Sequence, residues 1–339
     1  MRARAAAFVV ACAAFAAHGA QDFDKSSQYG PSPKLPEPAA SLLPQMNVPK
    51  VVPWAHGEMP AVPQGFRIEA AATGLANPRG VYPLPNGDLL IVESKKEAKE
   101  PVERPKRPIM AWVEKKAHGG SGGGPSNRIL LLRAGTTAPT VLIDHLNSPF
   151  GVVLVKDTLF VADTDAILRY PYSVGQDKVG GPGEKVVDLP AGPINHHWTK
   201  SLTASPDGSK LYVGVGSNSN AGERGVDAEK DRAAIWEVDA ATGAHRTFAK
   251  GLRNPNGLTF YPGSDVLWTV VNERDELGPN LVPDYLTSVK EGAFYGWPYS
   301  YWGQHVDPRV RPQRDDLVKA AIPPDYGLSS HVAPLGLAF

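Results

Sequence analysis

Two polar turns carry side chains that could act on a ligand. Residues 195–198 read Asn-His-His-Trp and stand before an apolar run, and residues 251–257 read Gly-Leu-Arg-Asn-Pro-Asn-Gly before another. A histidine such as His197 has an ordinary pKa of about 6.5, which suits proton abstraction near neutral pH. Arg253 and Asn254 stand on a turn that proline and glycine make rigid, which suits them to face a ligand. Packed or solvated histidines, and a surface turn with a solvated arginine, are the alternatives.

These turns belong to a repeat that runs through most of the chain. Each unit reads turn, strand, turn, strand and a further strand before the next turn, with no long helical pattern between. Four-stranded units that bury a face only against their neighbours predict an all-β fold of the β-propeller type, with about four blades and part of a fifth. A sandwich or barrel with chance turns is the alternative. The repeated turns are residues 77–81, 148–152, 198–202, 254–258 and 333–337.

Equivalent turns of a propeller meet at one end of its axis, however far apart they stand in the sequence. The repeat therefore predicts a shared polar pocket with two arginines and one or two histidines, suited to an anionic ligand. The residues that we expect at this mouth are Arg79, Asn147, His197, Arg253, Asn254 and His331.

Two insertions interrupt the repeat. Residues 95–127 carry a run of lysine and glutamate and then a glycine-rich stretch, which predicts a solvated, mobile loop. Residues 272–302 combine dense charge, in Asn-Glu-Arg-Asp-Glu at 272–276, with aromatic side chains, in Tyr-Gly-Trp-Pro at 295–298. That combination in one connection indicates a functional site.

The residues before the repeat differ from it in amino-acid composition. Residues 1–20 show a charged start, a short apolar run and small residues for cleavage, which predicts a signal peptide and a periplasmic or secreted protein. A retained anchor is the alternative, although the run is too short to span a bilayer. Residues 21–62 are proline-dense and predict an extended, poorly packed leader or linker. The propeller domain is expected over residues 63–339.

Composition excludes several classes of function. The 339 residues include 35 basic and 35 acidic side chains, so there is no excess of positive charge to bind nucleic acid. The single cysteine, Cys12, lies inside the predicted signal. The mature chain would therefore carry no disulfide, no thiolate metal site, no cysteine nucleophile and no covalently attached c-type haem.

Four motifs together resemble the soluble PQQ-dependent sugar dehydrogenases, and the sorbosone dehydrogenase branch in particular, over a match from about Phe66 to Phe339. The resemblance implies a six-bladed propeller that binds pyrroloquinoline quinone (PQQ) and calcium at its axial mouth. It also implies oxidation of an aldose or sugar aldehyde, with electrons passed to an external acceptor. The four motifs are His197 with Pro-Asp-Gly at 206–208, residues 251–257, residues 272–276, and Phe-Tyr-Gly-Trp-Pro at 294–298.

The same resemblance implies roles for individual residues. His197 would be the general base, which takes the proton of the substrate hydroxyl or hydrate while hydride passes to the quinone. Arg253 and Asn254 would bind the quinone oxygens and stabilise negative charge on reduction. The backbone carbonyls of Arg274 and Asp275 would hold calcium, where the glucose dehydrogenases carry glycine-proline.

Some features depart from the family pattern. His196 stands where the family has an aspartate beside the base, and no counterpart of the pocket glutamine occurs near Asn147. Both departures argue against glucose as the substrate. The chain also stops at the start of a fifth unit, so we expect a fragment or truncated reading frame and an open arc of blades. Arg79 and His331 complete the set of expected cofactor contacts.

Two other interpretations stay open. A calcium-dependent lactonase-type propeller hydrolase would need a carboxylate-rich calcium site at the axis, whereas the axial turns here carry arginine and histidine. A propeller that only binds, or an inactive fragment, is the non-enzymatic alternative. We expect an enzyme with a small-molecule sugar substrate, an external electron acceptor, no nucleic-acid partner and no membrane span.

Overall fold

The structure is a computed structural model, and it describes residues 23–39, 58–96 and 126–339. The predicted signal peptide, residues 1–20, lies outside the described residues. So does most of the charged insertion predicted at 95–127. Within the described ranges, no helix has the length and apolar content that crossing a membrane requires.

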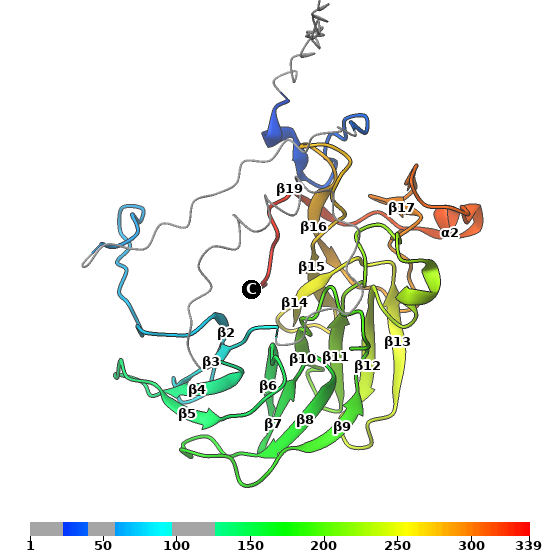
Figure 1. The fold of residues 1–339 in the computed structure, drawn as a ribbon. Helices are drawn as coiled ribbons and strands as arrows, with labels where there is room; N and C mark the ends of the chain where they lie inside the picture. The colour runs from blue at the N-terminus through cyan, green and yellow to red at the C-terminus, as the bar shows by residue number, and fades with distance from the viewer. Residues whose placement is uncertain (1–22, 40–57, 97–125) are drawn as a thin grey trace, which may run out of the picture.

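Three four-stranded antiparallel sheets follow one another along the chain, which confirms the predicted all-β propeller arrangement (Figure 1). The first sheet contains β2 (Pro78–Pro83), β3 (Leu89–Glu93), β4 (Arg128–Leu132) and β5 (Thr140–Ile143). The second contains β6 (Gly151–Val155), β7 (Thr158–Ala162), β8 (Ala166–Pro171) and β9 (Glu184–Asp188). The third contains β10 (Leu202–Ala204), β11 (Lys210–Val215), β12 (Ala234–Asp239) and β13 (His245–Lys250), with the short helix η2 (Val226–Glu229) between β11 and β12.

A fourth sheet has the strand order β14-β15-β16-β19-β1. Its strands are β14 (Pro255–Phe260), β15 (Leu267–Val271), β16 (Pro283–Ser288), β19 (Tyr326–Ser330) and β1 (Tyr29–Gly30). The insertion between β16 and β19 holds β17 (Ser300–Tyr301), β18 (His305–Val306) and helix α2 (Asp315–Ala320).

The fifth strand of this sheet comes from the predicted leader. Helix η1 (Lys25–Gln28) leads into β1, whose Tyr29 and Gly30 pair with Leu328 and Gly327 of β19. The expectation of a poorly packed leader does not hold for this stretch, because β19 presents an edge whose backbone groups need partners.

The strands form where apolar runs meet turn residues that reverse the chain. Gly87 and Gly208 close the β2–β3 and β10–β11 connections with φ angles of 86° and 73°, which glycine adopts without strain. The runs between the turns are apolar on both faces, as in β3, where four of the five residues are buried. Two buried faces are expected for a strand that lies between neighbouring sheets.

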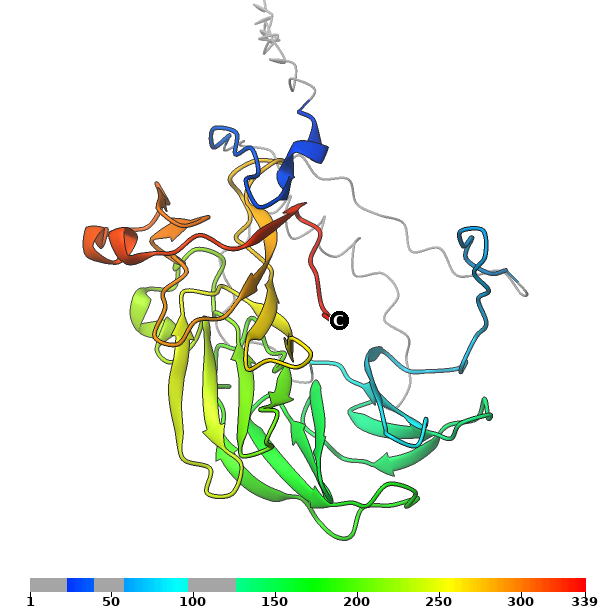
Figure 2. The same cartoon turned by 180° about the vertical axis from the view of Figure 1, so that it is seen from behind.

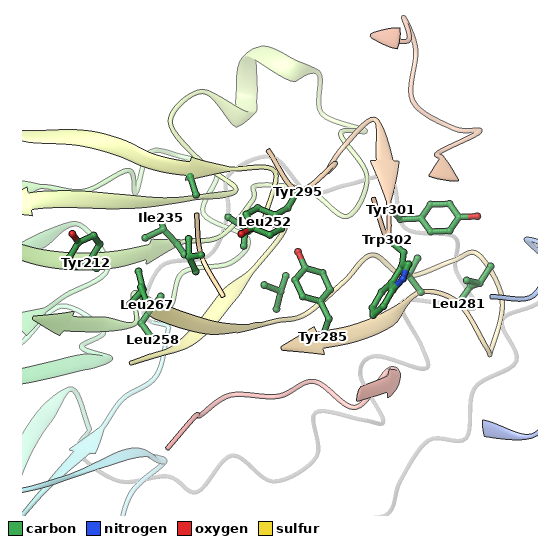
Figure 3. Close-up of a cluster of buried hydrophobic side chains, with 14 of the residues drawn as sticks. Tyr212, Ile235, Leu252, Leu258, Leu267, Leu281, Tyr285, Tyr295, Tyr301 and Trp302 are labelled. Atoms are coloured by element: carbon green, nitrogen blue, oxygen red, sulfur yellow. The ribbon is translucent and has the colours of Figure 1, made fainter. Parts of the chain in front are cut away.

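Each main hydrophobic cluster is shared by two neighbouring sheets. One joins the first and second sheets and contains Leu90 and Leu159, both fully buried. Another joins the second and third sheets, and a third cluster joins the third and fourth around Ile235 and Tyr285 (Figure 3). The sheets therefore stabilise one another through their faces, as the sequence repeat predicts.

The four sheets lie in an arc, with the first and the fourth at its ends (Figures 1 and 2). This agrees with the open arrangement expected from the sequence. Residues 331–339 form no strand, yet Gly336 and Leu337 lie against Gly257 of β14, much as Leu202 of β10 lies against Gly151 of β6.

Candidate functional site

His197 lies on the connection between β9 and β10, and its imidazole is oriented by Ser217. The ring Nδ1 lies 2.9 Å from the Ser217 carbonyl oxygen and 3.0 Å from Ser217 Oγ, and the His197 backbone N–H donates to the same carbonyl. Because a carbonyl can only accept, we assign the proton of the neutral ring to Nδ1. Nε2 therefore carries the lone pair that a base needs.

The surroundings of His197 favour its neutral form. Burial lowers the pKa of His197 well below its ordinary value, and the positive charge of Arg253 lowers it further. The ring of His196, 4.6 Å away between ring centres, acts in the same direction, while the bond to Ser217 opposes the shift. The imidazole is therefore unprotonated at neutral pH, as the predicted role as base requires.

Arg253 is held by protein oxygens at all five of its N–H groups. Nε and Nη2 donate to the carbonyl and side-chain oxygens of Asn220, both at 3.0 Å. Nη1 donates to the carbonyls of Asn272 and Glu273, at 3.1 and 2.7 Å. The remaining Nη2 hydrogen faces Asp275 Oδ2 at 3.2 Å. A ligand can therefore reach this guanidinium only by taking the place of one of these acceptors.

Asn254 offers a buried acceptor that lacks a donor. Its Nδ2 donates to Asn272 Oδ1 at 3.2 Å, and the Asn272 amide is itself oriented by a bond to the Pro334 carbonyl at 2.7 Å. Asn254 Oδ1 is buried without a hydrogen-bond partner. Asn254 Oδ1 and His197 Cβ both lie so close to Gly216 that a Cβ added there would clash with each of them. An unsatisfied buried acceptor beside a base suits a ligand hydroxyl.

His331 and Asp275 form an ion pair beside Arg253. The His331 Nδ1 lies 3.2 Å from Asp275 Oδ1, and Nε2 lies 3.1 Å from the Gly278 carbonyl oxygen. The hydrogen bond to Asp275 raises the pKa of His331 although burial opposes it, because both ring nitrogens face acceptors. Both oxygens of Asp275 are thus engaged, Oδ1 by His331 and Oδ2 by Arg253.

Arg79 reaches the turn of His197 but not that of Arg253. Its guanidinium lies over the ring of Trp198, 5.3 Å from the ring centre, and its Nε lies 3.4 Å from the Ser94 carbonyl oxygen. The contact brings the first and third sheets together at this mouth. Asn147, the other residue expected there, is exposed and bonds through its backbone N–H to Asp163.

The two residues predicted to hold calcium, Arg274 and Asp275, have protein partners in this structure. Arg274 is 1% exposed and pairs with Asp307 at 3.1 Å, while the Asp275 carbonyl accepts from Asn220 Nδ2 at 3.0 Å. No cluster of three or more His, Cys, Asp or Glu able to hold a metal occurs among residues 23–39, 58–96 and 126–339. The same loop does contain glycine-proline, at 278–279, where the Gly278 carbonyl accepts from His331.

Asn220 is a site residue that sequence reasoning missed. Besides its bonds to Arg253, its Oδ1 accepts from the Asp275 backbone N–H at 2.8 Å, and its carbonyl accepts from Trp297 Nε1 at 3.0 Å. One asparagine thus joins the third sheet to the 272–302 insertion. The run of serine and asparagine at 217–220, directly after β11, was the available signal.

Arg232 is a second missed residue, and it fixes the turn of His197. Its Nη2 donates to the carbonyl of His197 at 3.0 Å and to Asn195 Oδ1 at 2.9 Å, and its Nε donates to the Gly216 carbonyl at 2.9 Å. A buried cation with carbonyl partners holds the backbone on both sides of the candidate base. Nothing in the local sequence of Arg232 distinguishes it from a surface arginine.

Glu273 adds a titratable carboxyl directly behind Arg253. Burial raises its pKa to about 7, although the Arg274 backbone N–H, 3.0 Å from Oε2, opposes the shift. Its backbone N–H donates to Asp284 Oδ1 at 2.7 Å. The carboxyl therefore changes charge in the physiological range.

A recess of about 320 Å³ opens beside this network rather than over His197. It is lined by residues that directly follow network members along the chain, such as Ala221 after Asn220 and Pro298 after Trp297, together with Arg309 and Arg311.

Residues 134–339, more than half of the chain, match the TrAA12-like family. An uncharacterised protein of Borreliella burgdorferi is 29% identical over 152 residues, which are 44% of this chain and 39% of that protein, so this chain spans about two fifths of that relative's length.

Solved structures with the same fold include three from fungi and bacteria. The calcium structure of a Trichoderma reesei family AA12 enzyme has a TM-score of 0.60 at 20% identity, covering 79% of this chain and 71% of the other. The holo PQQ domain of pyranose dehydrogenase from Coprinopsis cinerea gives 0.63 at 19%, covering 82% and 72%. PQQ-bound aldose sugar dehydrogenase from Streptomyces coelicolor gives 0.53 at 19%, covering 80% and 74%. At these identities the likeness shows a shared fold.

Proposed function

The chain belongs to the TrAA12-like family, and we propose that it oxidises an aldose or sugar aldehyde with PQQ and passes the electrons to an external acceptor. The observation that carries the proposal is the pair of His197, with Nε2 unprotonated, and Asn254, with Oδ1 buried and without a donor, which both contact the position of an added Cβ at Gly216. The family membership and the PQQ-bound relatives of the same fold support the choice of cofactor.

His197 performs the proton transfer in this proposal. Its Nε2 takes the proton of the substrate hydroxyl, or of the hydrate of an aldehyde, while Nδ1–H stays bonded to Ser217. The carbon that bore the hydroxyl loses its hydrogen with two electrons and becomes a carbonyl. PQQ, when bound, supplies the acceptor for that hydride.

The residues around the base orient and charge the site. Asn254 Oδ1 accepts from a substrate or cofactor hydroxyl, and Arg253 adds a fixed positive charge that Asp275 partly balances. We propose Arg79 as a further contact at the mouth, because it lies over Trp198 next to His197. His331 would reach a ligand only if it left Asp275 or Gly278.

The finer features of the function are also proposals. We propose a sugar of the sorbosone or aldose type, and a periplasmic or secreted location that follows from the predicted signal peptide. Calcium has a place in the proposal only through the family resemblance, and no step is assigned to it because the Asp275 carboxylate is already engaged by Arg253 and His331. The lactonase alternative requires a carboxylate-rich metal site, and the described residues contain none.

The experiment that tests the function is dye reduction by the full chain in the presence of PQQ and Ca²⁺, with a panel of aldoses and sugar aldehydes. We expect sugar-dependent reduction. Replacing His197 with alanine should abolish turnover and leave PQQ binding, measured by absorbance titration, within about threefold of wild type, because proton transfer and binding are separate contributions. The matched control is His245→Ala, an exposed histidine that stacks on Trp236 of β12. Lactone hydrolysis without sugar-dependent dye reduction would overturn the proposal.

A further inference from the structure

The loop 277–280 is tied to the leader by two backbone carbonyls. The Ala39 backbone N–H donates to the Leu277 carbonyl at 2.8 Å, and Gln28 Nε2 donates to the Asn280 carbonyl at 2.5 Å. The leader and this loop are more than two hundred residues apart in the sequence, and Figure 1 shows the leader, in blue, beside β19 and β16.

The two carbonyls between these also accept from side chains, here from the end of β19. Ser330 Oγ donates to the Pro279 carbonyl at 3.2 Å, and His331 Nε2 lies 3.1 Å from the Gly278 carbonyl oxygen. Four consecutive carbonyls of an irregular loop are therefore fixed from outside it. Loop carbonyls are commonly left to water, so this pattern indicates a loop held in one position.

Gln28 connects the two sets of bonds through one buried amide. Its side chain is fully buried, and its Oε1 accepts from the Ser330 backbone N–H and from Ser329 Oγ, both at 3.2 Å. Oε1 also lies 3.0 Å from Ser330 Oγ and shares that single hydroxyl hydrogen with the Pro279 carbonyl. The amide oxygen thus holds the end of β19, while the amide nitrogen holds Asn280 of the loop. Every hydrogen bond of this amide serves the junction between leader, strand and loop.

The leader is packed into the fourth sheet and its loop. Gly327 of β19 faces the Gln28 carbonyl so closely that a side chain there would clash. An added Cβ at Gly278 would make a tight contact, 3.1 Å, with the Ala39 carbonyl oxygen. Leu35 packs against the cluster between the third and fourth sheets. Residues 24–39 therefore form a structural strap.

The strapped loop is continuous with the candidate site. Asp275, two residues before Leu277, pairs with Arg253, and His331 joins Asp275 to the Gly278 carbonyl. A shift of the loop therefore moves the Asp275 carboxylate, which balances the charge of Arg253. Arg253 is the charged group that lowers the pKa of His197 most.

We propose that residues 24–39 act as a strap and that Gln28 is its positioning residue. Through Asn280 and Ser330 it sets the loop 275–280, and through that loop the Asp275–Arg253 pair. The link to activity rests on the proposed function, whereas the effect on the loop does not.

The test compares Gln28→Met, which keeps the length of the side chain and removes its donor and acceptor, with Tyr29→Ala, whose exposed side chain lies on the same strap. Hydrogen exchange of the amides in residues 273–282 should be about tenfold faster in Gln28→Met, as expected for the loss of roughly one buried hydrogen bond, with the second sheet unchanged. In Tyr29→Ala both regions should exchange as in wild type.

The consequence for activity is measured separately. In Gln28→Met the apparent dissociation constant for PQQ should rise about tenfold with kcat at saturation within about twofold, because the loop positions the site without touching the reacting atoms. If Gln28→Met fails to fold, the second variant is Ala39→Pro, which removes the backbone N–H that the leader donates to the Leu277 carbonyl. It should give the same faster exchange and the same weaker PQQ binding.

Unchanged exchange of 273–282 in both Gln28→Met and Ala39→Pro would overturn the strap. Faster exchange in a protein whose wild type shows no PQQ-dependent oxidation would overturn the proposed function and keep the strap. Faster exchange with unaltered PQQ affinity would overturn the link between them.

Discussion

At the scale of single residues, the site depends on which groups are charged. Burial and Arg253 lower the pKa of His197, whereas Asp275 and the Gly278 carbonyl raise the pKa of His331. The pKa values of two histidines near one arginine are thus shifted in opposite directions. The causes differ: burial and the positive charge of Arg253 lower the pKa of His197, while the hydrogen bond to the Asp275 carboxylate raises the pKa of His331.

The pKa of His197 predicts the pH dependence of the proposed reaction. Because this pKa is depressed, the base stays unprotonated until the pH falls well below 6.5, so the acidic limb of kcat/KM against pH should lie below that value. The unfolded chain binds its proton already near the ordinary pKa, so this histidine's contribution to stability is present above pH 6.5 and is lost as the pH falls toward the folded pKa. An acidic limb above pH 6.5 would contradict the assignment of His197 as base.

Glu273 predicts the opposite dependence of stability on pH. Its pKa is raised from 4.5 to about 7, so its contribution is fully present below pH 4.5 and is lost as the pH rises through 7. Glu273→Gln keeps an acceptor for the Arg274 N–H and cannot ionise. Relative to wild type it should be equally stable at pH 4.5 and about 1–3 kcal/mol more stable at pH 8 by urea unfolding. Equal stabilities at both pH values would refute the raised pKa.

At the scale of elements, the site is made by connections rather than by strands. The loop after β11 supplies Asn220, the turn before β14 supplies Arg253, and the loop after β15 supplies Asp275. The strands bring these connections to the same end of neighbouring sheets. Hydrogen bonds between side chains and carbonyls then lock them together.

Asn220 is the element-scale residue whose loss should matter most. Asn220→Ala removes one bond to Arg253 and two to the backbone of Asp275, and leaves buried polar groups without partners, so it should cost about 2–4 kcal/mol. The control Asn218→Ala removes a single side-chain bond, to the Ala228 carbonyl, and should cost about 1 kcal/mol. Denaturant midpoints measure both, and equal losses would show that Asn220 has no special role.

At the scale of the whole molecule, stability comes from contacts between sheets. The main clusters each belong to two neighbours, and the inner strands approach one another at glycines. At Gly151 an added Cβ would lie 2.5 Å from the backbone nitrogen of Leu202 and 2.6 Å from the carbonyl oxygen of Lys200. At Gly80, which stands on the equivalent strand of the first sheet, an added Cβ would have no described residue within 4 Å.

This difference predicts the outcome of two matched substitutions. Gly151→Ala must separate the second and third sheets and should lower the free energy of unfolding by about 1–3 kcal/mol, because backbone atoms cannot turn aside as a side chain can. Gly80→Ala should change it by less than about 0.5 kcal/mol or raise it slightly. Thermal unfolding followed by circular dichroism compares them, and equal effects would contradict the packing of β6 against β10.

Much of the fold was predictable from the sequence because short local segments specify it. Apolar runs of strand length, turn pairs such as Asn86-Gly87 and the repeated turns each depend on neighbouring residues, and together they specify four-stranded sheets that stack. The position of His197 and Arg253 on equivalent turns follows from the same repeat.

Only the tertiary structure decided how these groups are used. Arg253 has no free N–H because Asn220 from one connection and Asn272, Glu273 and Asp275 from another meet there, and no local pattern records such a meeting. The leader likewise reads as a proline-rich linker, yet Gln28 is buried because the edge of β19 and the carbonyl of Asn280 provide its partners. Composition and periodicity determine which segments form strands, whereas the partners of a buried polar group depend on which distant segments converge on it.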